Sequence, residues 1–388
     1  MIFKSQTPWP WRLLRIALIA ALVAWLLPNF SEPKTKQAAY DPNWPKTNFN
    51  QRSVPLEEIR SGGPPRDAIP ALNDPHFISV SEAAHWLDAK EPVILVRHGH
   101  QARAYPLQIL LWHEIVNDRL DDLPLAITFC PLCNSALVFE RQHKGQVLDF
   151  GTTGKLRHSD LIMYDRQTES WWQQFTGQAI VGHYNGQHLK HYPSSLIAFH
   201  KFAQLYPKGS VLSRETGYQR AYGHNPYPGY DNINSTPFLL NQASDPRLPA
   251  LAYTLGIEWQ EKYKLYPASI LKNQPLLEDQ FQQQPVVIFS QQNLSSVLDQ
   301  KEIKNSRSRI NAHAFSTQLN GTVLKFQQIK GKILDQSGSQ WNLLGHAISG
   351  VHKGKQLQQL AGGVHFAFAW LAFRPKAEIY HRPVSPLP

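Results

Sequence analysis

The chain has 388 residues, of which 42% are hydrophobic and 18% charged, and its formal net charge is +10. This length allows one large domain or two, and the composition is that of a globular protein. Lysine and arginine are scattered and form no basic block, so the charge indicates a solvated basic surface and no nucleic-acid partner. The sequence contains no phosphate-binding, dinucleotide-binding or serine-hydrolase motif, so it predicts no organic cofactor.

Residues 1–30 have the pattern of an export signal. Three basic residues precede the apolar run 16–27: Lys4, Arg12 and Arg15. No clear small-residue cleavage site follows this run and tryptophans flank it, so we expect a retained signal anchor, with a cleaved signal peptide as the alternative. The sequence therefore predicts a single-pass protein of the bacterial inner membrane, with its bulk in the periplasm or outside the cell. A small-molecule or protein partner stays open.

The segments after the signal predict a β-rich protein. Residues 31–75, rich in proline, asparagine, lysine and glycine, are expected to be a linker. A capping-box pattern at Ser79 and Glu82 predicts a short helix over 82–89. Further elements are expected in chain order: strands 92–96 and 101–105 as a hairpin, a helix over 106–115, a strand at 126–129, and a hairpin of 136–141 with 146–150.

A glycine pattern indicates an internal repeat. The run Gly-x-Ala-Ile-x-Gly-x-x-x-Gly-x-x-Leu extends from Gly177 to Leu189 and recurs from Gly345 to Leu357, with further matches beside it in the same order. We therefore expect a β-rich α+β fold with two tandem, diverged copies of one mainly antiparallel β unit. The expected units are 76–215 and 253–388, joined by an aromatic connector rich in glycine and proline at 216–252.

The only cysteines, Cys130 and Cys133, lie in the run Thr128-Phe-Cys-Pro-Leu-Cys-Asn134. The residues after them are typical of a strand, so the pair is expected in a turn between strands, and not at the start of a helix as in thioredoxin-like proteins. A disulfide across so small a loop would constrain the unfolded chain little, so structural stabilisation is a poor reason for it. This arrangement favours a metal site over a redox helix, and a metal needs further ligands.

The comparison of the two copies predicts those ligands. Four residues are lost together in the second copy: His113, Glu114, Cys130 and Cys133 correspond to Gln274, Pro275, Ser290 and Asn293. His113 is therefore the expected third ligand, Glu114 a fourth ligand or a residue that orients the others, and His158 the second candidate. Two thiolates and an imidazole suit copper or zinc.

Two other functions stay open. In a thiol–disulfide protein, Cys130 would attack and Cys133 would resolve. In a ligand-binding or scaffold protein, the two copies would form a groove beside the aromatic segment 218–230. The ligand wall expected for such a role consists of Arg166, Trp171, Tyr222 and Tyr227. The competing interpretation is a buried turn in which Asp165 accepts backbone amides and Trp172 fills the core.

Several runs carry a resemblance to a family: Arg103-Ala-Tyr-Pro-Leu107, Trp112-His-Glu-Ile-Val-Asn-Asp118, Thr128-Phe-Cys-Pro-Leu-Cys-Asn134, Leu161-Ile-Met-Tyr-Asp-Arg166 with Thr168-Glu-Ser-Trp171, and Val211-Leu-Ser213 with Arg220-Ala-Tyr222. Over roughly residues 75–380 the chain resembles the bacterial and archaeal family catalogued as domain of unknown function 3179. The family has no settled activity, so the resemblance implies a shared unit and no reaction. In its pattern the position of His158 is more often asparagine, which leaves His113 ahead.

Overall fold

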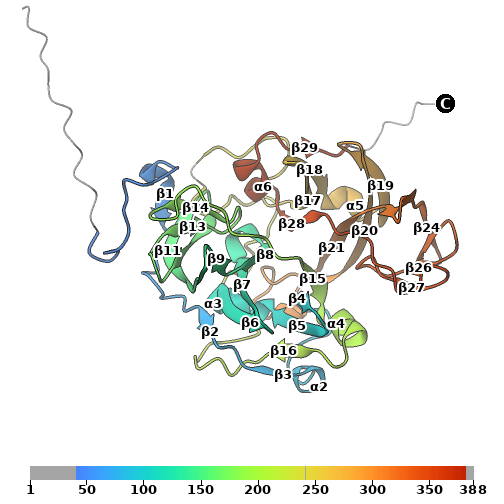
Figure 1. The fold of residues 1–388 in the computed structure, drawn as a ribbon, viewed down its shortest axis with the longest axis horizontal. Coiled ribbons are helices and arrows are strands. Elements are labelled where there is room, and N and C mark those ends of the chain that lie inside the picture. Colours follow the sequence, from blue (N-terminus) through green and yellow to red (C-terminus); the bar gives the residue numbers. More distant parts are fainter. Residues whose placement is uncertain (1–40, 241, 382–388) are drawn as a thin grey trace, which may run out of the picture. The chain divides into compact units, whose positions relative to one another are not determined.

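Antiparallel sheets dominate the structure, a computed structural model that describes residues 41–240 and 242–381 (Figure 1). The predicted β-rich class is confirmed, since many short strands alternate with a few helices of at most seven residues within the described ranges. The predicted signal at 1–30 lies outside the described residues. Within them, no helix is both long and apolar enough to cross a membrane.

The first half of the chain forms three main sheets and one small one. Sheet β15-β4-β5-β16-β3 consists of β3 (Phe77–Ser79), β4 (Pro92–His98), β5 (Gln101–Pro106), β15 (Ser194–Ala198) and β16 (Ser210–Leu212). Sheet β2-β6-β7-β8 consists of β2 (Leu72–Asn73), β6 (Ile115–Leu120), β7 (Leu123–Cys130) and β8 (Ser135–Glu140). Sheet β1-β11-β12-β13-β14 consists of β1 (Ile59–Ser61), β11 (Phe150–Arg157), β12 (Asp160–Asp165), β13 (Trp171–Gln173) and β14 (Gln178–Val181). The other elements are η1 (Leu56–Glu58), α2 (Val80–Ala83), α3 (Leu107–His113), η2 (Pro131–Cys133), β9 (Gln142–His143), β10 (Gln146–Val147) and α4 (Phe199–Leu205).

The second half follows a similar plan. Its sheets are β28-β17-β18-β29, β19-β20-β21, β22-β23 and β24-β25-β26-β27. The strands are β17 (Tyr253–Trp259), β18 (Lys262–Pro267), β19 (Leu276–Phe281), β20 (Gln284–Ser295), β21 (Ser308–Ser316), β22 (Gln318–Leu319), β23 (Thr322–Val323), β24 (Phe326–Ile329), β25 (Lys332–Asp335), β26 (Gln340–Trp341), β27 (Ala347–Ser349), β28 (Ala361–Phe366) and β29 (Glu378–Ile379). The helices are α5 (Ala268–Leu271), η3 (Ile303–Asn305) and α6 (Ala367–Phe373).

Equivalent polar contacts occur in both halves. The Tyr105 hydroxyl donates to the Asp118 carboxylate, and Tyr266 does the same to Asp279. Each half also buries a tryptophan whose indole N–H donates to an aspartate, from Trp172 to Asp165 in one half and from Trp341 to Asp335 in the other. Asp165 also accepts the backbone N–H of Thr168. The buried-turn interpretation of Asp165 and Trp172 is thereby confirmed.

The local predictions hold best where the contacts are short in sequence. The capping box is present, because Ser79 and Glu82 exchange side-chain and backbone hydrogen bonds at the start of α2. Strands β4 and β5 form the predicted hairpin. The predicted hairpin of 136–141 with 146–150 is wrong. Strand β8 pairs with β7 across the cysteine loop, and the turn at Lys144 closes only the two-residue strands β9 and β10.

The described part of the stretch expected to be a linker belongs to the folded unit. Trp44 and Phe49 are buried and meet the Trp171 ring edge-on at 5.1 and 5.2 Å between centroids. The Arg66 guanidinium lies 4.5 Å above the Trp44 ring and forms an ion pair with Glu169. A polar, proline-rich composition suggests a spacer, but the aromatic residues Trp44 and Phe49 in it pack against the apolar face of the sheet that contains Trp171.

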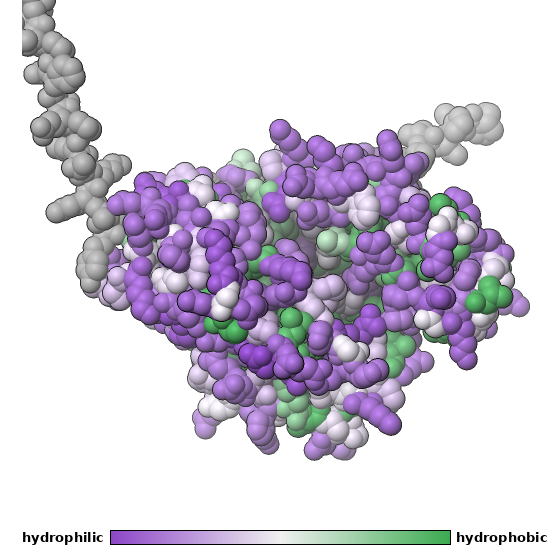
Figure 2. Space-filling model, in the orientation of Figure 1, coloured by the Kyte–Doolittle hydropathy of each residue, from purple (hydrophilic) through white to green (hydrophobic). Residues whose placement is uncertain are grey.

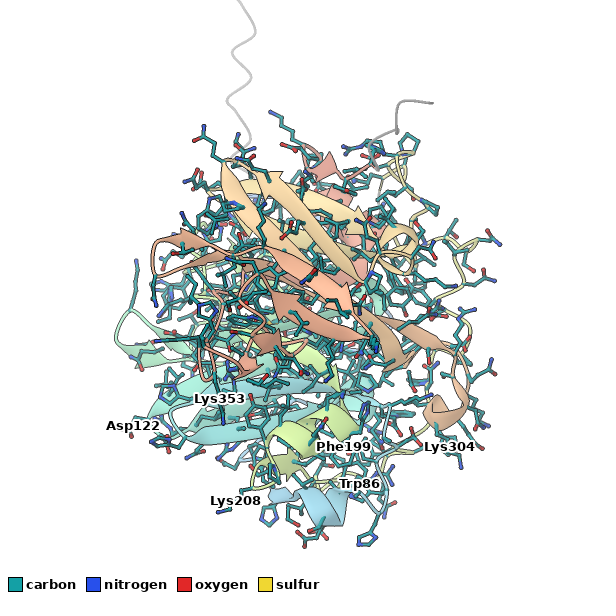
Figure 3. All side chains as sticks on the ribbon, turned by 90° about the vertical axis from the view of Figure 1, so that its right-hand side faces the viewer. Trp86, Asp122, Phe199, Lys208, Lys304 and Lys353 are labelled. Carbon is teal, nitrogen blue, oxygen red and sulfur yellow. The ribbon has the colours of Figure 1, made fainter. Side chains whose placement is uncertain are left out.

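The helices are short and scattered among the sheets, and they do not form a layer of their own (Figure 1). At one end of the molecule, Phe199 of α4 is buried in an apolar cluster against which Trp86, shortly after α2, also packs (Figure 3). The largest apolar cluster includes residues of both halves, since Cys130 and Cys133 share it with Phe366 and Trp370. The cysteine loop is therefore built into the centre of the protein.

Gly154 of β11 lies close to the backbone of Pro64, in the segment before β2, and this contact gives a stability prediction. Gly154 has φ +69°, and a Cβ there would lie 1.9 Å from the carbonyl oxygen of Pro64. Gly186 has φ +84° with nothing within 4 Å of such a Cβ. We expect Gly154→Ala to lower the free energy of unfolding by about 2 kcal/mol more than Gly186→Ala, because only the first adds a backbone clash to the strain of positive φ. Urea unfolding of both variants checks this, and equal losses would contradict it.

Candidate metal centre

The two cysteines lie in a tight loop that joins β7 to β8. Cys130 ends β7, the 3₁₀ turn η2 follows with Pro131 at its first position, and Asn134 closes the turn with left-handed φ 50° and ψ 37°. Cys130 then pairs with Ser135 across the hairpin. Because the turn is so short, both sulfurs stay close together, and both thiols are buried, 1% and 0% exposed. The predicted turn between strands is what the structure shows.

A second hairpin meets this loop. The last residue of β11, Arg157, pairs with the first residue of β12, Asp160, so only His158 and Ser159 form the turn. Their φ values are 52° and 65°, the left-handed pair that a two-residue turn requires and that Asn-Gly normally supplies. The carbonyl oxygen of Ser159 accepts from the thiols of Cys133 at 3.5 Å and Cys130 at 4.0 Å. Strained residues of this kind concentrate at functional sites.

Asp160 completes a group of three ligand-type residues. One of its carboxylate oxygens and the sulfurs of Cys130 and Cys133 all lie within 4.8 Å of one another, and all three residues are buried. Asp160 Oδ2 accepts from Gln173 Nε2 at 2.6 Å and from the Phe175 amide at 2.9 Å. Asp160 Oδ1 lies in no hydrogen bond of regular geometry, although the side chain is 0% exposed. The thiols of Cys133 and Cys130 are its neighbouring donors, and their hydrogen bonding to the carboxylate opposes the rise that burial causes in the Asp160 pKa. A buried carboxylate whose neighbours are two thiols is suited to bind a cation together with them.

Glu114 adds a fourth acidic group to the neighbourhood. It follows α3 with φ 56° and is buried. Burial and the nearby Asp160 raise the Glu114 pKa to about 8, and burial raises the Asp160 pKa to about 6. Burial also raises the pKa of both thiols. Within the described residues, no lysine or arginine is among the leading causes of these shifts, so the four acids are buried without a cation to offset them.

The connector covers this group. Burial raises the pKa of the Tyr227 hydroxyl, and the nearby Glu114 and Cys130 raise it further. Tyr230 lies beside Cys133 in the same way. The neighbouring Asp231 fixes this part of the connector to the second half through ion pairs with Arg307 and Arg309. The aromatic segment is therefore a packed cover over the cysteines, and this explains its irregular backbone.

The structure does not bring His113 into the group. Its Nδ1 donates to the Pro70 carbonyl at 2.8 Å, and its Nε2 accepts from the Tyr222 hydroxyl at 2.6 Å. With both ring nitrogens engaged, no lone pair is left for a metal. Burial accordingly lowers the His113 pKa to about 4. His113 is thus a positioning residue for the connector, and its expected place is taken by Asp160.

His158, the second candidate, also lies outside the group. Its Nε2 is 3.5 Å from the Glu58 carboxylate, and its ring meets the Phe373 ring edge-on. The turn explains this, because Ser159 presents its carbonyl and Asp160 its carboxylate to the cysteines, whereas the His158 ring packs against residues outside the group.

The expected ligand wall does not form one surface. Arg166 donates to both carboxylate oxygens of Asp67, so its charge is already paired. Trp171 is buried in the aromatic cluster with Trp44. Tyr222 is bound to His113, and only Tyr227 reaches the neighbourhood of the cysteines. The four residues make four separate contacts.

The second half lacks each element of the site. The Ser290 amide donates to the Pro275 carbonyl as the Phe129 amide donates to the Glu114 carbonyl, both at 2.8 Å. Gln291, and not Ser290, therefore occupies the place of Cys130, a one-residue correction that only the hydrogen-bond register reveals. Strand β20 runs on to Ser295 where the first half has its loop. The β24–β25 hairpin closes at Ile329–Lys332 and is too short to supply a residue at the place of Asp160.

The sequence alone does not point to Asp160, although this residue follows the candidate His158 by two positions. The available signal was the two-residue gap between 150–157 and 160–165, which is typical of a tight hairpin. Such a hairpin fixes which residue follows the turn, but the sequence does not show that its tip meets the cysteine loop.

One family model matches most of the chain. It is described as "Protein of unknown function (DUF3179)" and matches residues 66–377. This range contains Cys130, Cys133, Asp160 and Glu114, and it confirms the resemblance carried by the sequence runs. Neither curated proteins nor solved structures give a match. The chemistry of the site must therefore come from its own residues.

Proposed function

Because the chain belongs to the DUF3179 family, which brings no activity with it, we propose from the geometry of the site that this protein binds one metal ion through Cys130, Cys133 and Asp160. The observation that carries the proposal is the convergence of two sulfurs and a carboxylate oxygen within 4.8 Å in the buried centre, with Asp160 Oδ1 in no hydrogen bond of regular geometry. A bound cation supplies a partner for this oxygen. The Ser159 carbonyl is a further oxygen donor beside both sulfurs.

Charge supports the same proposal. Buried acids are tolerated when they stay protonated or when a cation compensates them. Two thiolates and one carboxylate carry three negative charges, and a divalent ion offsets two of them. Glu114 then stays protonated, since a fourth negative charge would be uncompensated. Its role is that of a neutral neighbour, and the expectation that it binds the metal gives way to this one.

The donor set favours zinc. Zn²⁺ accepts thiolate and carboxylate ligands together in tetrahedral sites, whereas copper in its soft Cu(I) state prefers sulfur without carboxylate. Three protein ligands leave a fourth position for the Ser159 carbonyl, for water or for a substrate. Metal handling at the membrane is the role that such a site supports, and copper is the alternative metal.

The location of the protein is part of the proposal. A basic stretch followed by the apolar run 16–27 favours a signal anchor, with residues 41–381 exported. The membrane is then the partner of the N-terminal segment. We also propose that the two halves are diverged copies of one unit, supported by their matching sheet orders and by the paired Tyr–Asp and Trp–Asp contacts. Only the first copy has kept a site.

Thiol–disulfide exchange is the second candidate, supported by the proximity of the two free cysteines. An attacking cysteine needs a thiolate, which a low pKa supplies. Here burial raises the pKa of Cys130, and nearby acids raise it further. This environment disfavours the attacking thiolate, so metal binding is the better supported function.

The test is the metal content of the full chain, purified in detergent under anaerobic reducing conditions without added metal. We expect about one zinc per chain in the natural protein and none in Cys130→Ser/Cys133→Ser, because thiolates are the strongest ligands of the set. His113→Gln is the control, since it changes the residue first expected to bind the metal, and it should keep the ion. Metal retained without the cysteines, or lost only with His113, would contradict the proposal.

A further inference from the structure

A cavity of about 250 Å³ lies where the two halves meet. Its walls come from strands β8 and β15 of the first half and from β21 and β28 of the second. These strands lie together near the middle of the molecule (Figure 1), and the surface is hollowed at the same place (Figure 2). Each of the four is the outermost strand of its sheet. The cavity therefore lies between the edges of sheets and not within one of them.

A branch point in the backbone separates β8 from β15. The Glu140 amide donates to the Lys190 carbonyl at 2.9 Å, and the Tyr192 amide donates to the Val138 carbonyl at 2.8 Å. The chain after Tyr192 leaves β8 and pairs with β4 as strand β15. Strands β8 and β15 therefore diverge from this point and leave a gap between them.

The second half repeats this branch point. The Ser316 amide donates to the Gln358 carbonyl and the Leu360 amide to the Ala314 carbonyl, both at 2.9 Å. The chain then leaves β21 and pairs with β17 as strand β28. The cavity is thus enclosed by two equivalent pairs of diverging strands, one from each half.

Side chains join the two strand pairs and keep the space between them open. Asn134 donates to the Val364 carbonyl at 3.1 Å, and Gln359 donates to the Ser194 carbonyl at 3.3 Å, each across the boundary between the halves. Several lining residues near the branch points are too small to fill the gap: Ala136, Ser194, Ser195, Ala312, Gly362 and Gly363. Because the backbone holds the strands apart, the cavity is a fixed feature of the fold.

The larger lining side chains are mainly apolar or aromatic. Five of them are only partly buried, so they keep surface with which to contact an occupant: Leu137, Leu196, Tyr253, Tyr263 and Val364. Ligand sites of proteins have this character, a mainly hydrophobic wall with few polar groups. An apolar cavity of about 150 Å³ binds benzene. This cavity is larger and has room for a ring with a short side chain.

The charged residues of the lining offset one another. Arg309 forms an ion pair with Asp231. The Arg374 guanidinium lies 4.5 Å above the Tyr263 ring, and Glu258 interacts with the same tyrosine. Burial raises the Tyr263 pKa, Arg374 lowers it and Glu258 raises it, so the two opposite charges act on one hydroxyl. Neither charge is left to bind an ion.

The lining histidines add no charge near pH 7. Burial lowers the pKa of His313 and His365 to about 4, and that of His191 as well. An ion that entered this cavity would lose its hydration without gaining a partner of opposite charge, which is costly. The lining therefore favours a neutral occupant.

We propose that this cavity binds a small, neutral, largely apolar molecule between the two diverging strand pairs. Edge strands present backbone N–H and C=O groups that no neighbouring strand uses, so a hydroxyl at one end of the ligand can be hydrogen-bonded there. The proposal is independent of the metal, because Cys130, Cys133 and Asp160 do not line the cavity.

Calorimetric titration of the full chain in lipid nanodiscs tests the proposal, with 2-phenylethanol as the probe and empty nanodiscs as the blank. Phenylacetate and 2-phenylethylammonium are an anion and a cation of similar size. We expect one site per chain that binds 2-phenylethanol at least about tenfold more tightly than either ion, because each ion would give up its hydration. Equal or tighter binding of either ion, or no saturable binding of the alcohol, would overturn the proposal.

Two variants fill the cavity from opposite sides. Leu196→Trp in β15 and Val364→Trp in β28 each add a ring to the space that the ligand needs, and each should weaken 2-phenylethanol binding at least about tenfold. Leu205→Trp in α4 is the matched control, because Leu205 is also partly buried but does not line the cavity. It should leave binding unchanged. Natural affinity in both cavity variants, or an equal loss in all three, would contradict the proposal.

Discussion

The affinity of the centre for Zn²⁺ should rise about a hundredfold for each unit of pH between about pH 6.5 and 7.5. Burial raises the pKa of both thiols above the ordinary value of about 9, so each carries its proton throughout this range when no metal is bound. Zinc binds the thiolates, and each displaced proton contributes a factor of ten per pH unit. Two displaced protons therefore give two decades per unit.

Below about pH 6 the dependence should steepen to three decades per unit. Burial raises the Asp160 pKa to about 6, so this carboxyl also binds a proton there that zinc must displace. Competition with a chromophoric chelator, corrected for the chelator's own protonation, measures the slopes. Asp160→Asn should bind zinc more weakly and keep two decades per unit at low pH. A natural protein that shows one decade per unit would mean that only one cysteine binds the metal.

The parts of the site that follow from short-range sequence could be predicted, and those that depend on packing could not. Cys130 and Cys133 share one turn, and Pro131 with the strand-forming residues after Cys133 specifies its geometry. Asp160 is close in space only because the β11–β12 hairpin is long enough to reach that turn. The length of a hairpin can be predicted from the sequence, but which part of the protein its turn contacts depends on how the sheets pack.

The joint loss of residues between the two halves is a partly correct signal. Glu114 does lie beside Asp160 and Cys130, so its replacement by proline in the second half fits the loss of the cysteines. His113 differs for another reason, because its ring is hydrogen-bonded to Tyr222 of the connector and lies outside the group formed by the cysteines and Asp160. A comparison of copies finds residues that serve the same region, and it does not separate ligands from the residues that pack the cover.

The stretch expected to be a linker, residues 31–75, also shows that contacts between distant residues cannot be predicted from composition. Its composition is that of a linker, but Trp44 and Phe49 are buried against Trp171. The sequence contains these aromatics, and their burial depends on an apolar face of sheet β1-β11-β12-β13-β14 that is formed by residues more than a hundred positions later. Composition averages over a segment and overlooks two large side chains that are buried.

Glu114→Gln should stabilise the metal-free protein at pH 8 by about 4 kcal/mol and leave its stability at pH 4.5 almost unchanged. Burial and Asp160 raise the folded pKa of Glu114 to about 8, from an ordinary value of 4.5. Between these values the folded state keeps a proton that the unfolded state has released. The free energy of unfolding therefore falls as pH rises, by up to about 1.4 kcal/mol per unit. Glutamine does not titrate, so the variant avoids this loss.

Urea unfolding with chelator present, at several pH values from about 4.5 to 8, measures the difference. Glu302→Gln is the control, because its side chain is 48% exposed, and its stability curve should run parallel to that of the natural protein. If the stability of Glu114→Gln also changed with pH in parallel with that of the natural protein, Glu114 would have to be ionised in the folded state. The same variant should also keep its zinc, because a neutral Glu114 contributes no charge to the bound ion. Stabilisation together with intact metal binding would separate this residue from the three ligands.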